Sequence, residues 1–478
     1  PLIWNKSIAF QKFQRYAHGE MELDEYLAYL AGHIGSGPRA FPLYANDVEI
    51  FDFRPGRYHT EAPLQEDGEW RRLDLLFAAL RADPRFELVP PGRVLGMMGE
   101  RGAGRPLRLG SPEQPIPVKK QGKYNVVRWA VTGRDDLGIN TACWRLFKTL
   151  SAKPRATDDE WRELCYLWSS DFRTHITERR WKSYTRRLSA FGKKVGAPAL
   201  LPRPPARSAP GKTLPSGAAR RGGELTIRSG RLTVKMNCRR GLALQGVWLG
   251  PADGPPLVGT LPHGFYDDIS FGSDWYTGHA VLEAPGQPKI TDLAPIEPSV
   301  AKTRSGDWLV SAKIPTPLGP VFKSVGISAR NPALTLSYRF EWARMPMGSL
   351  RLGNITLHPD SFRRASLRYA VRNGGRALET FPLAGTTVDH GAPVSFLVSA
   401  RTALGMTDGR VELGDARRRV VVESDQASAA LVGMISYRET NGSYFCRLAL
   451  SAGELDETRR PETRKKDRLA CRVSLRFE

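Results

Sequence analysis

Two acidic residues alternate along the segment 43–54, whose other residues are largely apolar. Asp47 and Glu49 would lie on one face of a strand, because successive side chains of a strand point to opposite faces. The apolar neighbours, such as Val48 and Phe51, favour a strand buried on both faces, as in a barrel or a parallel sheet. Carboxylates at the carboxyl end of a barrel strand lie where active sites form. The alternative is an ordinary strand with an exposed acidic face.

A second segment, residues 119–141, concentrates aromatic, amide and cationic side chains beside acids. These residue types are typical of sugar-binding sites, where flat ring faces stack on sugars and planar polar groups bond to hydroxyls. We therefore predict that five of its residues bind a sugar: Tyr124, Asn125, Arg128, Trp129 and Arg134.

A third segment, residues 168–175, places Ser169, Ser170 and Asp171 on a helix otherwise lined with aromatic residues. Asp171 joins the predicted sugar-binding residues, because a carboxylate accepts hydrogen bonds from hydroxyls. The alternative is that these residues end one helix and cap the next, a role that Ser and Asp favour.

Other motifs predict no metal and no cofactor. The eight histidines are dispersed without an H-E-x-x-H pattern, and Gly99–Gly104 lacks the Lys-Ser/Thr ending of a phosphate loop. The run 179–187 interleaves aromatic residues with cations, as a nucleic-acid surface can. A solvated helix face with buried aromatic anchors explains the run better, so nucleic acid is the less favoured partner.

Composition bounds the class of protein. The 478 residues are 41% hydrophobic and 25% charged, which is typical of a globular protein of several domains. Their formal net charge of +22 favours an anionic partner. No apolar run is long enough to predict a membrane span. Five scattered cysteines without a C-x-x-C motif indicate a reducing, cytoplasmic location.

The acidic segment resembles a known enzyme family. Asp47-Val48-Glu49 is similar to the D-G-E motif of the family-57 glycoside hydrolases, which are related to the family-38 α-mannosidases, and residues 168–171 resemble their later S-D-aromatic motif. The β-rich C-terminal half, with residues 263–268 and 273–276, is similar to their β-sandwich. The resemblance implies a retaining glycoside hydrolase or transglycosylase acting on a polysaccharide or oligosaccharide, in which Asp47 is the general acid/base and Glu49 lies beside it.

The chain also departs from that family. Val48 replaces the glycine of the motif, and the residues before Asp47 are too few for several βα units of roughly 30 residues each. The nucleophilic glutamate of the family lies on an earlier strand, which we do not find. We therefore expect a second polypeptide or an N-terminal half to complete the barrel and supply the nucleophile. A non-catalytic carbohydrate-binding protein is the alternative.

Hydrophobic periodicity gives the order of elements. Helical spacing over 23–30 and 70–80, and the capping box of Thr157 with Glu160, predict helices. Beyond a Pro/Gly/Arg-rich stretch the period changes to two, which predicts an antiparallel β-sandwich. The expected fold class is α/β plus all-β: the end of a (β/α)7-like catalytic barrel at 1–110, helices closing the active site at 111–196, a linker at 197–223 and a sandwich at 224–478.

The excess of cations predicts the kind of glycan. Arg128, Arg134 and Arg173 lie near the proposed site in sequence, and guanidinium groups match carboxylate or sulfate oxygens. We therefore expect an acidic glycan to be preferred over a neutral glucan.

Overall fold

The computed structural model describes residues 7–37, 39–44, 68–100, 110–117, 122–173, 176–198, 214–267, 276–343, 345–457 and 468–478. The chain divides into two compact units, Pro1–Arg108 and Leu109–Glu478, here called the N-terminal and C-terminal units. Each is described by itself.

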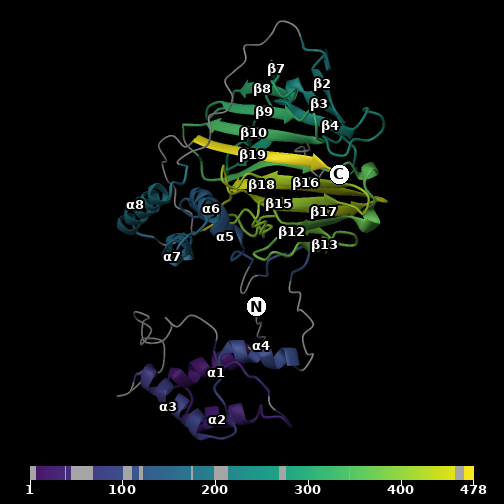
Figure 1. The fold of residues 1–478 in the computed structure, drawn as a ribbon. Helices are drawn as coiled ribbons and strands as arrows, with labels where there is room; N and C mark the ends of the chain where they lie inside the picture. The colour runs from purple at the N-terminus through teal and green to yellow at the C-terminus, as the bar shows by residue number, and fades with distance from the viewer. Residues whose placement is uncertain are drawn as a thin grey trace. The chain divides into compact units, whose positions relative to one another are not determined.

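The described part of the N-terminal unit is helical (Figure 1). Its helices are α1 (Ser7–Ala17), α2 (Leu23–Ala31), α3 (Glu69–Ala82) and α4 (Pro91–Glu100). Buried aromatic and leucine side chains of α1, α2 and α3 form one core. In it the rings of Tyr16 and Tyr26 stack with centroids 5.5 Å apart. The helical spacing expected over 23–30 and 70–80 is confirmed by α2 and α3.

The prediction that residues 1–110 end a (β/α) barrel is wrong. The described residues of this range form helices and no strand. Residues 43–44, at the start of the segment expected to form a buried strand, are irregular, as are the residues 40–42 before them. Tyr44 stacks on Phe13 of α1 at 5.1 Å, so this stretch covers the helices instead of pairing with a sheet. Every strand pair that the structure describes is antiparallel, whereas the barrel needs parallel strands.

The C-terminal unit begins with a helical region. It contains α5 (Val127–Ala130), α6 (Asp136–Ser151), α7 (Asp158–Leu167), the 3-10 helix η3 (Ser170–Phe172) and α8 (Glu178–Val195). The predicted capping box is confirmed, since the Thr157 hydroxyl accepts from the Glu160 backbone and the Glu160 carboxylate accepts from the Thr157 backbone. Ile139, Phe172, Tyr184 and similar side chains fill the core between these helices.

Antiparallel strands make up the rest of the unit. They are β1 (Ala218–Arg221), β2 (Glu224–Ser229), β3 (Leu232–Asn237), β4 (Ala243–Leu249), β5 (Ala280–Glu283), β6 (Ile290–Thr291), β7 (Ser299–Lys302), β8 (Trp308–Ile314), β9 (Val321–Ile327), β10 (Ala333–Glu341), β11 (Ser349–Thr356), β12 (Arg368–Val371), β13 (Glu379–Pro382), β14 (Val388–Asp389), β15 (Arg410–Gly414), β16 (Arg419–Ser424), β17 (Val432–Thr440), β18 (Ser443–Gly453) and β19 (Arg468–Phe477). Short 3-10 helices are η4 (Cys238–Arg240), η6 (Pro359–Ser361) and η7 (Arg364–Ser366).

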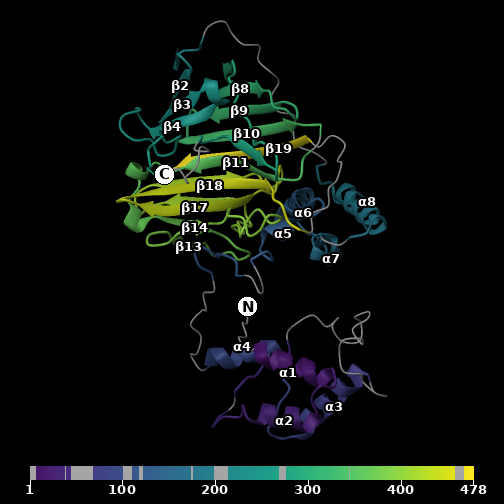
Figure 2. The same cartoon turned by 180° about the vertical axis from the view of Figure 1, so that it is seen from behind.

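The strands form three sheets. A nine-stranded sheet has the order β13-β12-β15-β16-β19-β10-β9-β8-β7, a six-stranded sheet the order β14-β17-β18-β11-β5-β6, and a four-stranded sheet the order β1-β2-β3-β4. In Figure 1 the nine-stranded sheet lies toward the viewer. Figure 2 shows the molecule from behind, and there β11, β17 and β18 of the six-stranded sheet lie toward the viewer. Strand β1 begins within the stretch expected to be a linker.

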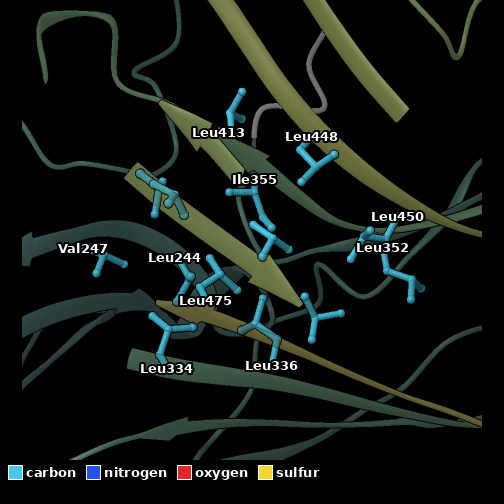
Figure 3. Close-up of a cluster of buried hydrophobic side chains, with 14 of the residues drawn as sticks. Leu244, Val247, Leu334, Leu336, Leu352, Ile355, Leu413, Leu448, Leu450 and Leu475 are labelled. Carbon is cyan, nitrogen blue, oxygen red and sulfur yellow. The ribbon is translucent and has the colours of Figure 1, made fainter. Parts of the chain in front are cut away.

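The layers enclose one large apolar core. Burial alternates along β9 and β10, so that one face of each strand points inward and the other outward. Figure 3 shows the inward side chains meeting from several sheets. Those labelled include Leu244 of β4, Leu336 of β10, Ile355 of β11, Leu413 of β15 and Leu448 of β18. Alternation of this kind is what the C-terminal half of the sequence predicts.

The core also contains a buried charge pair. The ammonium of Lys323 lies 3.0 Å from a carboxylate oxygen of Asp292, and neither side chain is exposed to solvent. The other oxygen of Asp292 accepts from the backbone of Ala280 at 2.8 Å. Burial lowers the pKa of Lys323, and Asp292 acts in the opposite direction. The loop at Gly241 packs so closely here that a Cβ atom would lie 1.7 Å from the Asp292 carbonyl oxygen, which requires glycine.

Candidate functional site

The segment 122–131 joins the helical region to the sandwich through Asn125. This side chain is buried, and its amide donates to the carbonyl oxygens of Gly122 (2.8 Å), Ala400 (3.0 Å) and Arg401 (2.8 Å). Its oxygen accepts from the backbone of Val127 at 2.8 Å. Asn125 therefore fixes the start of α5 against the loop before β15, and its polar atoms already have partners within the protein.

Arg128 is the second attachment of this segment. It is buried, and its guanidinium donates to Asp456 (3.0 Å) and to Glu457 (3.2 Å), which follow β18. The ring of Tyr124 lies beneath it, 4.5 Å from the guanidinium carbon. The hydrogen bond from Lys123, together with one from Arg128, lowers the pKa of Glu457. Arg128 and Lys123 therefore form one ionic cluster with the two acids, and the Tyr124 ring packs against the Arg128 guanidinium.

Arg134 is engaged at the other end of the segment. Its guanidinium donates to Glu178, the first residue of α8, at 2.6 Å. It also lies over the ring of Trp181 at 4.8 Å. These contacts fix the start of α8 to the loop before α6.

A hub of hydrogen bonds brings the segments 119–141 and 168–175 together. The Asn140 side-chain oxygen accepts from the Trp168 indole at 2.8 Å and from the buried Arg173 guanidinium at 2.9 Å. The Trp129 carbonyl accepts from Arg173 at 3.0 Å and from the Asn140 amide at 3.2 Å. Two donors therefore hold the backbone of Trp129. Asn140 also holds the Trp168 indole, and Arg173 donates to the Trp168 backbone carbonyl at 3.3 Å.

Trp129 itself is 37% exposed above this hub. Among the described residues, no aromatic or cationic group contacts it. Asp171 of η3 is exposed, and its carboxylate forms no hydrogen bond or ion pair with any residue that the structure describes. The exposed ring on a fixed backbone offers a stacking face, and Asp171, two residues before Arg173 in the chain, offers a hydrogen-bond acceptor. We call Trp129, Asn140, Trp168, Asp171 and Arg173 the Trp129 site.

Further aromatic side chains extend from the site along α6 and α7. The Trp168 ring meets Trp144 edge to face at 5.7 Å, Trp144 meets Phe147 at 5.3 Å, and Phe147 meets Trp161 at 5.9 Å. Phe147 is exposed, whereas the three tryptophans are half-buried. The helices α5–α8 lie beside the sandwich in both Figures 1 and 2.

The predicted sugar-binding residues therefore separate into two groups. Among the described residues, Trp129 and Asp171 form no side-chain hydrogen bond or ion pair and lie at the surface. Asn125, Arg128 and Arg134 bind other parts of the protein, and the Tyr124 ring lies against the Arg128 guanidinium. Arg173 is likewise engaged with Trp129 and Asn140. The three arginines from which we expected a preference for acidic glycans thus all have internal partners. Asp47 and Glu49, the predicted catalytic residues, lie outside the described residues.

Sequence reasoning missed three parts of this surface. Asn140 and Trp144 lie four residues apart on α6, a spacing that would have placed them on one helix face next to Trp168. The loop 391–398 exposes Phe396 (78%) at its tip, and Val394 of this loop packs near Gly122. The apolar stretch Val-Ser-Phe-Leu follows Gly and Pro, a pattern that predicts a strand. The sequence therefore does not indicate that Phe396 is exposed at the tip of a loop.

The described part of the chain holds no cluster of three or more His, Cys, Asp or Glu residues that could hold a metal ion. It also holds no helix of sufficient length and apolar character to cross a membrane.

Comparisons with known proteins gave structural neighbours only. No family model matches the chain, and no curated protein matches it. A galactose mutarotase-like protein of Clostridium acetobutylicum is 10% identical, with 53% of this chain and 95% of that chain covered at a TM-score of 0.34. A similar protein of Lactobacillus casei is also 10% identical, with 54% and 100% covered at 0.34.

Part of a larger enzyme is a third neighbour. The GH36 α-galactosidase of Geobacillus stearothermophilus is 11% identical, with 53% of this chain and 40% of that chain covered at a TM-score of 0.31. At this identity and score, the likeness does not extend to a substrate or a reaction.

Proposed function

We propose that the C-terminal unit binds a carbohydrate chain at the Trp129 site. The observation that supports this most is the exposed Trp129 ring, whose backbone is held by Arg173 (3.0 Å) and Asn140 (3.2 Å). A ring on a fixed backbone loses little conformational entropy when a sugar stacks on it. Asp171 accepts hydrogen bonds from sugar hydroxyls, and the aromatic side chains along α6 continue the surface for further sugar units.

The finer form of this proposal is a retaining glycoside hydrolase or transglycosylase. It rests on the resemblance of Asp47-Val48-Glu49 and of residues 168–171 to motifs of family-57 glycoside hydrolases. Retention requires two carboxyl groups about 5–5.5 Å apart, one a nucleophile and the other a general acid/base. Asp47 would protonate the leaving oxygen and then activate water or an acceptor sugar.

A binding experiment tests the first proposal. The full chain is titrated with soluble α-glucan oligosaccharides and other neutral oligosaccharides, and heat or Trp fluorescence is recorded. Trp129→Ala should weaken binding about fivefold or more, if stacking of a sugar on the ring contributes as much as stacking of a nucleic-acid base, roughly 1–3 kcal/mol. Trp129→Phe keeps a ring and should keep most of the affinity. Trp70→Ala, which removes another exposed tryptophan from the N-terminal unit, is the matched control.

An activity experiment separates the enzyme from a non-catalytic binding protein. Glycan cleavage or transfer is measured by product chromatography for the unmodified chain and for Asp47→Asn. If cleavage occurs and Asp47→Asn removes it while binding at Trp129 persists, the glycosidase is supported. If binding occurs without cleavage in either protein, this chain by itself is a carbohydrate-binding protein, and cleavage would need the expected second polypeptide that supplies the nucleophile. Unchanged cleavage by Asp47→Asn eliminates Asp47 as the acid/base.

A further inference from the structure

Helix α8 carries seven exposed basic side chains in two rows. The outer row lies opposite the buried face of Tyr184, Phe191 and Val195. Its members, three, four and seven residues apart, are Arg179, Lys182, Arg186 and Lys193. The inner row lies beside the outer row, nearer the buried face, and consists of Arg180, Arg187 and Lys194. At 3.6 residues per turn these spacings keep each row on one stripe of the helix surface.

The inner row is engaged with neighbouring elements. Arg187 donates two hydrogen bonds of 2.6 Å to Glu163 of α7, and Arg180 lies 5.5 Å from the ring of Phe172. Lys194 lines a cavity of about 480 Å³ between α7 and α8, together with Glu160. These cations therefore hold α8 to α7 and η3.

The outer row has no such role. None of its four members forms an ion pair with a described residue. Within the helix, Arg186 donates a hydrogen bond of 3.1 Å to the Lys182 carbonyl. The acid on α8 itself, Glu178, is bonded to Arg134. Because the apolar face of α8 is buried in the helical core, the helix has no face left to insert into a lipid layer. What remains is a cationic strip about 21 Å long.

We propose that the outer row binds an acidic polysaccharide, so that the glycan of the proposed function is anionic. The inference rests on that function. The start of α8 is bonded through Glu178 to Arg134, which lies five residues after Trp129 in the chain. In this inference the preference for an anionic glycan comes from the outer row and not from Arg128, Arg134 and Arg173. Cations along the strip are about 5–10 Å apart, whereas duplex DNA presents a charge about every 1.7 Å. The spacing suits a polymer charged once per sugar better than a nucleic acid.

The test compares two fourfold variants of the full chain. One variant changes the outer row, Arg179→Gln, Lys182→Gln, Arg186→Gln and Lys193→Gln. The matched control removes the same charge from the sandwich, Arg228→Gln, Arg231→Gln, Arg304→Gln and Lys313→Gln, at exposed positions without ion pairs to described residues. Binding of polygalacturonate, a neutral α-glucan and duplex DNA is measured at several salt concentrations. Circular dichroism verifies that both variants are folded.

The expected result is tighter binding of polygalacturonate than of neutral glucan, weakened at least tenfold by the outer-row variant and not by the control. The slope of log affinity against log salt should fall by about 3, if each cation contributes as much as in complexes with single strands. Neutral glucan binding should be equal in both variants. Equal effects of the two variants overturn the inference, as does DNA binding that is tighter and displaces the polysaccharide.

The outcomes also separate this inference from the proposed function. If Trp129→Ala leaves all glycan binding unchanged while the outer-row variant abolishes polygalacturonate binding, the Trp129 site is wrong and the strip is right. If Trp129→Ala abolishes binding of both glycans and the outer-row variant changes neither, the strip is wrong and the site is right.

Discussion

The sandwich and the helical region of the C-terminal unit both bury polar groups, but with different results. In the sandwich, Lys323 and Asp292 bind each other with no exposed surface. In the helical region, the buried Arg173 and the partly buried Asn140 hold the backbone of a residue whose ring faces solvent. Buried polar groups therefore stabilise the layers of the sandwich against one another, whereas in the helical region they position a surface. A substitution in the buried charge pair of the sandwich should lower stability. A substitution at the exposed surface of the helical region should lower glycan binding.

The largest expected loss of stability comes from the sandwich. Lys323→Met removes one partner of a fully buried pair and leaves Asp292 without its counter-charge. Breaking such a pair costs about 3–5 kcal/mol in the free energy of unfolding, whereas replacing both members by apolar groups of similar volume costs little. Urea unfolding should show this loss for Lys323→Met and a partial recovery for Lys323→Met with Asp292→Leu. If the double variant is no more stable than Lys323→Met, the loss does not come from leaving Asp292 without its counter-charge.

The next largest effect depends on pH. His390 is buried, with Nε2 2.8 Å from the Pro112 carbonyl and Nδ1 accepting from the backbone of Ile435. Burial lowers its pKa to about 4, below the value near 6.5 of an unfolded histidine. Between these values the unfolded chain binds the extra proton. Stability is therefore complete above pH 6.5 and should fall by about 3 kcal/mol as the pH drops to 4.

A variant identifies the source of this pH dependence. His390→Gln keeps a donor near the position of Nε2 and cannot take up the proton, so the decline between pH 6.5 and 4 should become shallower. Thermal unfolding at several pH values measures it, with His33→Gln in the N-terminal unit as the control. An unchanged profile for His390→Gln would assign the decline to other groups, among them His279, whose pKa burial also lowers.

Substitutions of Arg128 and Arg134, which hold the helical region in place, should lower stability less, and by different amounts. Arg128→Ala leaves the buried Asp456 without its guanidinium, and loss of hydrogen bonds to a charged group costs about 1.5–3 kcal/mol. Arg134→Ala breaks a pair whose acid, Glu178, is 63% exposed, so we expect less than about 1 kcal/mol. Hydrogen exchange should show α5 and α6 less protected in Arg128→Ala than in Arg134→Ala. The reverse order would mean that the Asp456 cluster does not attach the helices.

Local rules predicted the elements better than the site. Thr157 and Glu160 lie within one turn, and hydrophobic periodicity is carried by neighbouring residues, so the capping box, α2, α3 and the alternating strands follow from short windows of sequence. The barrel was wrong because an apolar stretch such as residues 40–44 packs equally well on helices or in a sheet. Its partner determines the outcome, and the partner is distant in sequence.

The candidate site shows the same limit. Aromatic and amide residue types indicated the segments 119–141 and 168–175, and the structure joins them through Asn140. Whether a cation is free or engaged could not be predicted, because the acids that bind Arg128 lie more than three hundred residues later in the chain. Asp47 and Glu49 stay predictions.

The smallest expected effect on stability is at Trp129, where the effect on binding is largest. Trp129→Ala removes a ring that touches no aromatic or cationic group among the described residues, and its backbone carbonyl still accepts from Arg173 and Asn140. Surface substitutions of this kind change the free energy of unfolding by about 0.5 kcal/mol or less. Asn140→Ala is the informative partner, because it removes three hydrogen bonds of the hub and should loosen the same ring without altering it. Thermal unfolding should find Asn140→Ala less stable than Trp129→Ala, while both weaken glycan binding. If Trp129→Ala destabilises the protein as much as Asn140→Ala does, the ring is part of the helical core and the distinction between the two regions fails.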